Sequence, residues 1–345
     1  MKNKKVIIGI VIILIIIAII VATILIINKN DEEKAKQSLI DYMNLINDKN
    51  YEAMYEKVTN INTIDKENFI TRNQNIYEGI DSTNINIEIK EIVKEDDEYK
   101  INYHQKMYTS AGEVEFDNSV NMVKQDKEYK LRWSSKIIFP ELNEKDKVRV
   151  ETIKSKRGSI LDRNNIPLAE DGQIASVGIV PGKLGTNKDE NISRISELTG
   201  VSVDYINESL SASYVKDDTF VPIKKISDSN TELKEQLLQI SGVMINKEDG
   251  RVYSLGKEAG HLIGYVQEIN AEELEKNEGK GYTSTSLIGK SGLELSYEDT
   301  LRGIDGTRIY ILDEEGEEKT EIVKQDKKDG QDVKLTIDSS LQKNI

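Results

Sequence analysis

Three serine–lysine pairs with the spacing S-x-x-K are the first candidates for chemistry in this sequence. On a helix, this spacing places a lysine amine one turn from a serine hydroxyl, where the amine can accept the hydroxyl proton during acyl transfer. The pairs are Ser213–Lys216, Ser254–Lys257 and Ser340–Lys343. Serine and lysine are common enough here for such pairs to arise by accident, and a working set also needs S-x-N and K-[ST]-G downstream. No S-x-N lies between Ser213 and Lys290, and Ser340 is followed by only five residues, so we predict no catalytic residue.

The histidine and cysteine content argues against metal and cofactor chemistry. There is no cysteine, and the two histidines, His104 and His261, are far apart in the sequence. They supply too few ligands for a transition-metal site, and no Ser-His-Asp set can be singled out. Gly289-Lys290-Ser291 is similar to the end of a phosphate-binding loop, but Ser284 stands where that loop needs a glycine. We therefore predict no metal and no cofactor.

The charge of the chain argues against nucleic acid as a partner. The 47 lysine and arginine residues are outnumbered by 61 aspartate and glutamate residues, which gives a formal net charge of −14. Binding to DNA or RNA depends on clustered basic side chains that displace counterions from the phosphates. We do not expect so acidic a chain to bind a polyanion.

An uncharged apolar run at residues 6–27 predicts a membrane-spanning helix. Its length corresponds to roughly 33 Å of helix, against about 30 Å for the hydrocarbon core of a bilayer. Lysines precede the run at positions 2, 4 and 5, and acidic residues follow it at 31–33. The positive-inside rule then places the N-terminus in the cytoplasm and residues 28–345 outside. A cleaved signal peptide is the alternative, but the run is longer than a signal sequence needs and lacks an A-x-A site.

The part that follows the apolar run reads as a small α+β domain. Apolar residues recur at helical spacing over 31–50, and shorter helices are predicted near 51–58 and 65–80. Between residues 85 and 133 the period changes to two, which predicts four antiparallel strands. We expect the sheet to curl around the helices as a cone, with Trp133 as a core anchor. A filled core is the simpler interpretation of the interior, and a ligand cavity is the alternative.

The second part, after a charged connector near residues 141–150, reads as a lobed α+β region. Helical periodicity predicts helices over 189–198, 203–210 and 230–240. Strands are predicted at 307–312 and 333–337. The fold class is therefore α+β, with a single membrane helix and two domains outside the membrane.

One longer pattern is more specific than any of these. Residues 156–169, KRGSILDRNNIPLA, predict a strand, a polar turn and a returning strand, in which Arg157, Asp162 and Arg163 can make charge-assisted hydrogen bonds. The string resembles the R-G-x-I-x-D-R-N opening of the dimerisation, or pedestal, domain of class B penicillin-binding proteins. Further matches follow in the family's order. The motif positions are Arg157, Gly158, Asp162, Arg163, Asn164, Gly260, His261, Gly264, Gly289, Gly292, Glu294, Gly303 and Gly306.

The resemblance implies a domain order for the whole chain. Residues around Trp133 to Pro140 are similar to the subgroup typified by the staphylococcal methicillin-resistance penicillin-binding protein, whose membrane-proximal domain is a cone of the nuclear-transport-factor-two type. We expect a cytoplasmic tip and membrane anchor at 1–28, the cone at 29–145, the pedestal at 146–330 and the start of a transpeptidase domain at 331–345. Within these matches Ser291 and His261 are expected to be structural.

The resemblance also implies a function. Class B penicillin-binding proteins are D,D-transpeptidases that crosslink peptidoglycan through an acyl-serine enzyme, and β-lactams acylate the same serine. This chain is expected to be the non-catalytic anchor and pedestal in a bacterial plasma membrane, inactive alone, with peptidoglycan strands and cell-wall synthesis proteins as partners. A second copy of the chain is a further candidate partner, and β-lactam resistance is a candidate role. The alternative is a stand-alone membrane-anchored protein that binds the cell wall or acts as a scaffold.

Overall fold

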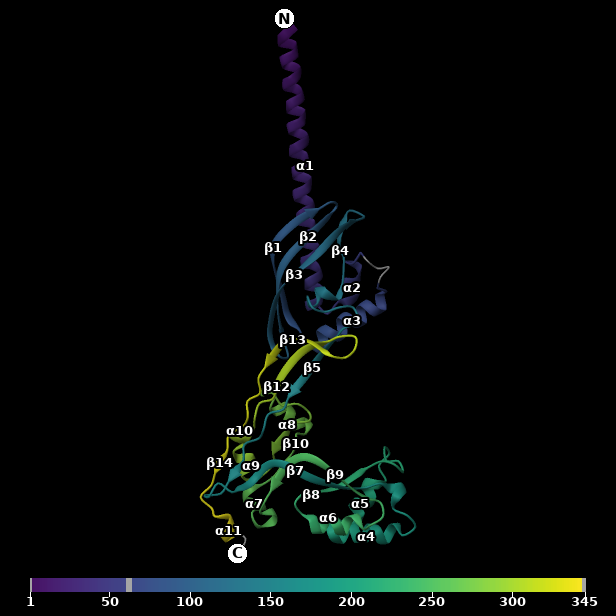
Figure 1. Cartoon of the computed structure of the whole chain (residues 1–345), viewed down its shortest axis with the longest axis vertical. Coiled ribbons are helices and arrows are strands. Elements are labelled where there is room, and N and C mark those ends of the chain that lie inside the picture. Colours follow the sequence, from purple (N-terminus) through teal and green to yellow (C-terminus); the bar gives the residue numbers. More distant parts are fainter. Residues whose placement is uncertain (1, 60–63, 343–345) are drawn as a thin grey trace. The chain divides into compact units, whose positions relative to one another are not determined.

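The chain folds into two compact units, and neither is one continuous segment of sequence (Figure 1). The structure is a computed structural model that describes residues 2–59 and 64–342. The first unit comprises Met1–Ile153 and Gly306–Asp326, and the second comprises Lys154–Asp305 and Lys327–Ile345. Both units contain helices and strands, which confirms the predicted α+β class.

The first unit begins with one long helix, α1 (Lys2–Asn47). The sequence predicted a membrane helix and a separate amphipathic helix, but no glycine or proline lies between residues 28 and 47 to interrupt the backbone. The C-terminal end of α1 buries Leu39, Tyr42 and Ile46 in the core. Among the described residues, Leu14–Asn47 is the one stretch of helix that is long and apolar enough to cross a membrane, with a mean hydropathy of 2.0 over an 18-residue window.

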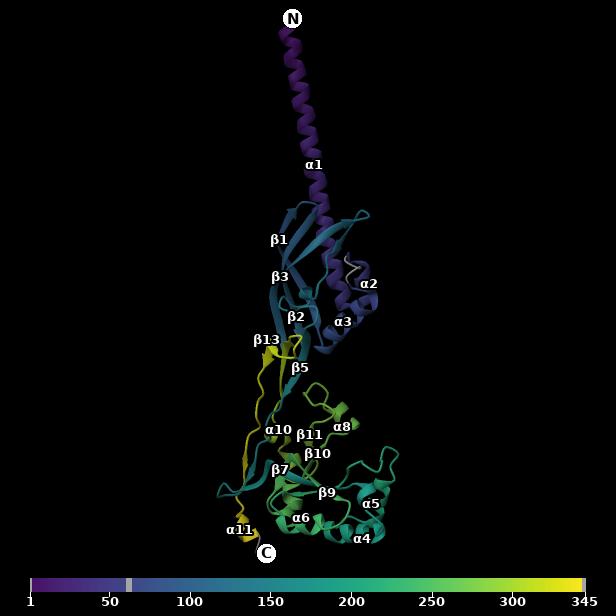
Figure 2. The same ribbon diagram turned by 45° about the vertical axis from the view of Figure 1, so that its right-hand side comes forward.

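Two short helices and a four-stranded antiparallel meander complete the predicted core of the first unit. The helices are α2 (Tyr51–Glu56) and α3 (Lys66–Gly79). The strands are β1 (Thr83–Glu95), β2 (Glu98–Thr109), β3 (Gly112–Gln125) and β4 (Glu128–Leu131), in the order β1-β2-β3-β4. In Figure 2 the sheet and the helices α2 and α3 flank the lower part of α1. The predicted change from helical to strand periodicity is confirmed.

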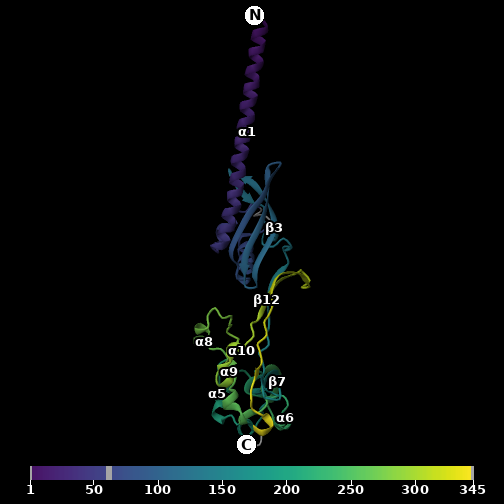
Figure 3. The same cartoon turned by 90° about the vertical axis from the view of Figure 1, so that its left-hand side faces the viewer.

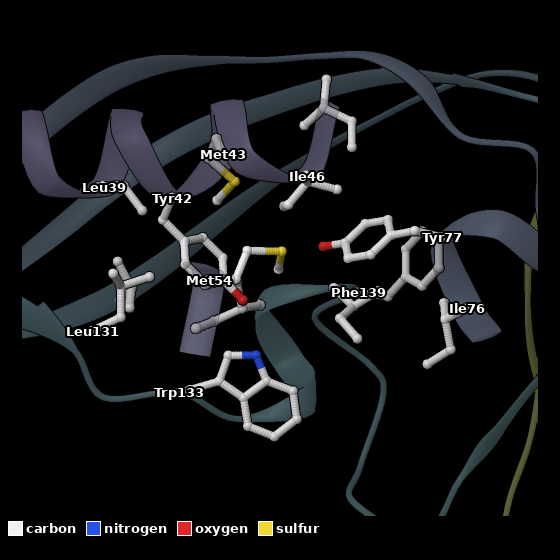
Figure 4. Packing of buried hydrophobic residues seen from close by; sticks show 14 of the residues in the cluster. Leu39, Tyr42, Met43, Ile46, Met54, Ile76, Tyr77, Leu131, Trp133 and Phe139 are labelled. Atoms are coloured by element: carbon white, nitrogen blue, oxygen red, sulfur yellow. The ribbon is translucent and has the colours of Figure 1, made fainter. Parts of the chain in front are cut away.

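Side chains from all these elements fill the interior between the sheet and the helices. Figure 4 shows Tyr42 and Tyr77 entering the same interior from opposite sides, among Met43, Met54 and Trp133. Trp133 is 3% exposed and meets Phe69 edge to face, with 5.1 Å between ring centroids. The prediction that Trp133 anchors a core is confirmed.

A second sheet of the first unit joins residues that are distant in sequence. Its strands β5 (Lys147–Ile153), β12 (Gly306–Leu312) and β13 (Glu318–Gln325) are antiparallel, in the order β13-β12-β5. Ile309 and Ile311 of β12 are fully buried in the core of the first unit. The domain order expected from the sequence includes residues 306–326 in the pedestal. In the structure this hairpin packs with the first unit, because β12 pairs with β5.

The second unit is organised around a five-stranded sheet. Its strands are β6 (Ile160–Leu161), β7 (Pro167–Ile179), β8 (Val221–Ser227), β9 (Val243–Tyr253) and β14 (Val333–Lys334). The long strand β7 pairs with β6, β8 and β9, and β14 pairs with β6 in parallel. The predicted helices are confirmed as α4 (Lys188–Thr199), α5 (Val203–Leu210) and α6 (Thr231–Leu238). Ile192, Ile195 and Leu237 from α4 and α6 pack with β7 in one apolar cluster.

Smaller elements form the rest of the second unit. A two-stranded ladder of β10 (Val266–Glu268) and β11 (Leu287–Gly289) lies in sequence among α7 (Gly260–Ile263), α8 (Ala271–Lys276), α9 (Gly292–Ser296) and α10 (Glu298–Leu301). The last described helix is α11 (Ser339–Gln342). The predicted strand at 333–337 is confirmed only for β14, and the chain beyond it is held by single hydrogen bonds.

Candidate functional site

A fully buried carboxylate, Glu294 at the start of α9, lies at the centre of the second unit. Arg157 donates from Nε to Glu294 Oε2 at 2.7 Å, and Arg251 donates from Nε to Glu294 Oε1 at 2.9 Å. The side chains of Glu294 and Arg251 are 0% and 2% exposed, and that of Arg157 is 9% exposed. One carboxylate therefore joins the segment before β6 to strand β9 without access to water.

Glu298 in α10 is the second acidic partner of Arg157. Its Oε2 accepts from Arg157 Nη2 at 2.7 Å and from the Gly289 backbone N–H at 2.9 Å, and its Oε1 accepts from the Tyr282 hydroxyl at 2.8 Å. Burial acts to lower the pKa of Arg157, but the hydrogen bonds and charges of Glu298 and Glu294 outweigh it and raise that pKa. Arg157 is therefore held as a cation.

Arg251 completes the network on its other side. Its Nη2 donates to the Gly158 carbonyl at 2.7 Å, and its Nη1 donates to Asp171 Oδ1 at 3.0 Å. Asp171 Oδ2 in turn accepts from the Arg157 backbone N–H at 2.8 Å. A buried charge is tolerated when partners occupy its hydrogen-bonding positions, and both guanidinium groups meet that condition here. We call Arg157, Arg251, Glu294, Glu298 and Asp171 the charge network.

Glycines let backbone segments approach closely around the charge network. A Cβ on Gly289 would lie 2.1 Å from the Glu294 carbonyl oxygen, and one on Gly264 would lie 1.9 Å from the Ser291 carbonyl oxygen. Gly292 has φ of +57°, a conformation that favours glycine. The motif glycines at positions 264, 289 and 292 therefore reflect contact between α7, β11 and the start of α9.

Residues 155–158, where the chain enters the second unit, pack against two later segments of the same unit. The Gly158 N–H donates to the Leu301 carbonyl at 2.7 Å, and a Cβ on Gly158 would lie 2.0 Å from the Gln331 carbonyl oxygen. A Cβ on Gly303 would lie 2.5 Å from Ser155 Oγ. These contacts bring residues 155–158, 301–303 and 331 together, and each leaves no room for a side chain.

Asp162 is a second buried carboxylate, in the turn after β6. Its Oδ1 accepts from the backbone N–H groups of Asn164 at 2.7 Å and Ile166 at 2.9 Å. Its Oδ2 accepts from the Ser339 hydroxyl at 2.8 Å and the Ser339 N–H at 3.1 Å. Burial acts to raise the pKa of Asp162, but these four hydrogen bonds prevail and lower it to about 2. The carboxylate thus closes its own turn and holds the first residue of α11.

The two neighbours of Asp162 act more weakly. Arg163 has a side chain that is 53% exposed and lies 3.8 Å from Asp338, while Asn164 Nδ2 donates to the same carboxylate at 3.3 Å. The Arg163 backbone N–H donates to the Ile337 carbonyl at 2.9 Å. The turn at 162–164 is therefore fastened to residues 337–339, chiefly through Asp162 and backbone groups.

The remaining motif positions, Gly260, His261 and Gly306, lie away from the charge network and from the Asp162 turn. Gly260 begins α7, where a Cβ would meet nothing within 4 Å, and His261 is exposed on the same helix. Gly306 begins β12, which belongs to the first unit. The sequence does not mark Arg251, Asp171 or Glu298 as members of the network, because no local pattern identifies an arginine on a strand as the partner of a glutamate 43 residues later.

The serines of the three serine–lysine pairs lie at separate places in the second unit. Ser213 lies in a turn between α5 and β8, and the Ser254 hydroxyl donates to the Pro167 carbonyl at 2.7 Å. Ser340 lies in α11 beside Asp338, and its hydroxyl is 2.5 Å from Asp338 Oδ1. Lys343 and the side chain of Lys257 lie outside the described residues. Within the described residues, the centre of the second unit is a structural charge network with no paired nucleophile and base.

Comparisons with known proteins match both parts of the chain. The model for the penicillin-binding protein dimerisation domain matches residues 152–335, and the model for the NTF2-like N-terminal transpeptidase domain matches residues 34–146. Penicillin-binding protein 3 of Bacillus subtilis is 34% identical over 310 residues, which is 87% of this chain and 46% of that protein.

Two more distant proteins match a shorter stretch. The peptidoglycan D,D-transpeptidase MrdA of Acinetobacter baumannii is 28% identical over 207 residues, covering 59% of this chain and 31% of that protein. The solved complex between penicillin-binding protein 2 and MreC from Helicobacter pylori contains a chain that is 23% identical with a TM-score of 0.36, covering 57% of this chain and 37% of that one.

The two family matches follow each other along the chain in the order that the motif strings predicted. The chain spans less than half the length of the curated relatives it matches. The dimerisation-domain match alone covers residues 152–335, more than half of the 345 residues, and contains the whole charge network. The chain therefore belongs to the class B penicillin-binding proteins, of which it represents the N-terminal region with the dimerisation domain.

Proposed function

We propose that this chain is the membrane-anchored pedestal of a peptidoglycan D,D-transpeptidase, and that its work is to hold and orient a catalytic region. The observation that carries the proposal is the charge network, which ties the entry of the second unit to β9, α9 and α10 through buried ion pairs. A buried and fully hydrogen-bonded network specifies one arrangement of the backbone. A second unit made rigid in this way is suited to holding a catalytic region in a fixed orientation.

The hydrogen bonds of Asp162 support the same proposal, because they hold a segment near the end of the described residues. β14 pairs with β6, and Ser339 is held by the Asp162 carboxylate, so residues 333–339 follow the path of the turn at 160–164. The direction in which the chain leaves the second unit is thereby set by the second unit itself. The domain boundaries that we propose are 1–28 for the tip and anchor, 29–145 for the cone, 146–330 for the pedestal and 331–345 for the start of the transpeptidase domain.

The membrane topology is part of the proposal. The apolar run at 6–27 would cross a bacterial plasma membrane once, with the lysines at positions 2, 4 and 5 in the cytoplasm and residues 28–345 outside. The length and mean hydropathy of the helix support a membrane span, and the flanking charges support its direction. This side of the membrane is where a transpeptidase would meet the cell wall.

The substrate and partners are inferred from the relatives. The A. baumannii relative is named as a peptidoglycan D,D-transpeptidase, so peptidoglycan strands and cell-wall synthesis proteins are the partners we propose, with a second copy of the chain as a further one. The acyl-serine step, and any part in β-lactam resistance, would belong to the catalytic region. Residues 1–345 would supply only position and orientation.

Labelling with a fluorescent penicillin tests the division of labour. The full chain in detergent micelles should not be labelled, whereas B. subtilis penicillin-binding protein 3 serves as the positive control. A hybrid in which this chain replaces the matching 46% of that relative should be labelled at the relative's rate. Labelling of the chain alone that is lost in Ser254→Ala or Ser213→Ala would overturn the proposal, as would a hybrid that folds and inserts but is not acylated.

A further inference from the structure

The rim of the first unit nearest the apolar run of α1 is fastened to the first turn of helix that follows that run. The Lys94 ammonium donates to Asn28 Oδ1 at 2.9 Å, and the Tyr99 hydroxyl donates to the Asn28 carbonyl at 3.1 Å. Lys124 donates to Asp31 Oδ2 at 2.7 Å. Figure 3 shows α1 continuing beyond the sheet from this level.

The opposite end of α1 is fastened to the opposite end of the sheet. Asn47 exchanges two hydrogen bonds of 2.8 Å with the backbone of Ile85 at the start of β1. From Asn28 to Asn47 the helix rises about 29 Å, at 1.5 Å per residue. From Ile85 to Lys94 the strand spans about 30 Å, at 3.3 Å per residue. Helix and strand therefore run side by side, and the turn after β1 points toward the apolar run.

This arrangement gives the rim a definite height on a bilayer. The apolar run ends at Ile27, and the helix rises about 6 Å from Ile27 to Asp31. The headgroup layer on each side of the hydrocarbon core is about 5–7 Å thick. The side chains that bond Asn28 and Asp31 therefore lie within that layer, and the turns at 95–98 and 125–128 reach at least as far.

The chemistry of the rim suits phospholipid headgroups. Lysine and tyrosine are the residues that anchor proteins at a membrane interface. Here the Lys94 ammonium lies 5.7 Å from the centroid of the Tyr99 ring, and Lys124 lies 5.7 Å from that of Tyr129. The turns add the exposed side chains of Glu95, Asp96, Asp97, Asp126, Lys127 and Glu128. The excess of carboxylates over lysines favours headgroups that carry an amine, and the lysines can pair with the headgroup phosphate.

We propose that this rim, residues 94–99 and 124–129, docks on the phospholipid headgroup layer and fixes the orientation of the first unit on the membrane. The inference rests on the proposed membrane anchoring by α1, and it adds a second contact to that anchor. Because α1 is continuous and the rim is hydrogen-bonded to it at Asn28 and Asp31, the first unit has no flexible joint at the membrane surface.

Site-directed fluorescence quenching tests this docking. The chain has no cysteine, so Asp97→Cys, Lys127→Cys and Ser110→Cys each create one labelling site. Ser110 is the matched control, because it is an exposed residue in the turn between β2 and β3, about 40 Å of strand away from position 97. Each full-length variant is labelled with an environment-sensitive dye in vesicles of phosphatidylethanolamine and phosphatidylglycerol that contain a headgroup nitroxide lipid.

We expect loss of fluorescence at positions 97 and 127 and none at position 110. A chain that floats with the vesicles but is equally bright at all three positions would overturn the docking and leave the anchor intact. Equal quenching at all three positions would also overturn it, because the unit would then lie flat without a defined rim. A chain that does not float with the vesicles would overturn both the docking and the anchor.

Discussion

Replacing Glu294 by leucine is the sharpest test of the charge network. Leucine is similar in size to glutamate, so the change removes the charge with little loss of volume. It leaves Arg251, whose side chain is 2% exposed, and Arg157, at 9%, each without the carboxylate that both share. Arg157 retains Glu298 and Arg251 retains Asp171, but each Nε loses its acceptor.

The magnitude follows from the burial of the guanidinium groups. Breaking a buried ion pair by removing one partner costs about 3–5 kcal/mol, because it leaves a buried charge uncompensated. The unfolding temperature of a unit of this size falls by about 2–4 °C per kcal/mol, so we expect a decrease of about 6–20 °C. The decrease should be confined to the second unit.

Differential scanning calorimetry of the full chain in micelles provides the assay, with hydrogen exchange assigning each transition to a unit. The backbone amides of Gly158 and Gly289 should lose protection, because their segments contact the network. Lys276→Ala is the control. It breaks an exposed pair with Glu272 at 2.7 Å, whose side chains are 70% and 76% exposed, and it should change the unfolding free energy by less than about 0.5 kcal/mol.

A compensating variant distinguishes charge from shape. Arg157→Met, Arg251→Leu and Glu294→Leu together remove the three most deeply buried charges. They leave Glu298, whose side chain is 11% exposed and keeps its hydrogen bonds from Tyr282 and the Gly289 N–H. Replacing buried ion pairs by apolar side chains is often neutral or stabilising. We expect this triple variant to regain most of the lost unfolding temperature. An unfolding temperature for Glu294→Leu equal to that of the Lys276→Ala control would refute the reasoning, as would a triple variant less stable than the single one.

Three further changes test the glycine contacts, a titration and the core of the first unit. Gly264→Ala would place Cβ 1.9 Å from a carbonyl oxygen at φ of +79° and should cost about 3 kcal/mol or more in urea unfolding, whereas Gly260→Ala, with nothing within 4 Å, should cost less than about 0.5 kcal/mol. Because the folded pKa of Asp162 is lowered from 3.8 to about 2, its stabilising effect is present above pH about 4 and is lost as the pH falls toward 2, so hydrogen exchange should show residues 333–339 opening in that range. Tyr77→Phe should raise the thermal stability of the first unit by about 1–3 kcal/mol, because this buried hydroxyl has no hydrogen-bond partner within the described residues.

Each of these three predictions has its own contrary result. Equal stability of the two glycine variants would mean that α7 can move away from the start of α9. Asp162→Asn should open residues 333–339 already at neutral pH, so protection that survives both this change and acid would refute the role of the carboxylate. A lower stability of Tyr77→Phe would show that the hydroxyl is hydrogen-bonded after all.

The local elements were predictable from the sequence because their causes are local. The helices over 31–50 and 189–198 bury apolar residues at three- and four-residue steps, and the strands between 85 and 133 alternate between a buried and an exposed face. Periodicity is a property of residues that are close in sequence, so it does not depend on how the rest of the chain folds. The turn at 162–165 was also predictable, because the Asp162 side chain accepts a hydrogen bond from the Asn164 backbone within the turn.

Partners that are far apart in sequence were not predictable. The hairpin of β12 and β13 joins the first unit because β12 pairs with β5, and the spacing of Ile309 and Ile311 indicates a strand but not which sheet it enters. Arg251 likewise has the polarity of a surface residue, and only the fold places it against Glu294.

The motif strings show the same division most clearly. The sequence by itself determined the family order of Arg157, Asp162, Glu294 and the glycines, and with it the prediction of a pedestal rather than an active site. Only the tertiary structure decided that Gly264 lies against a backbone carbonyl while Gly260 faces open space. The physical reason is that a residue's chemistry is fixed by its type, whereas the cost of changing it depends on the atoms that the fold brings within contact distance.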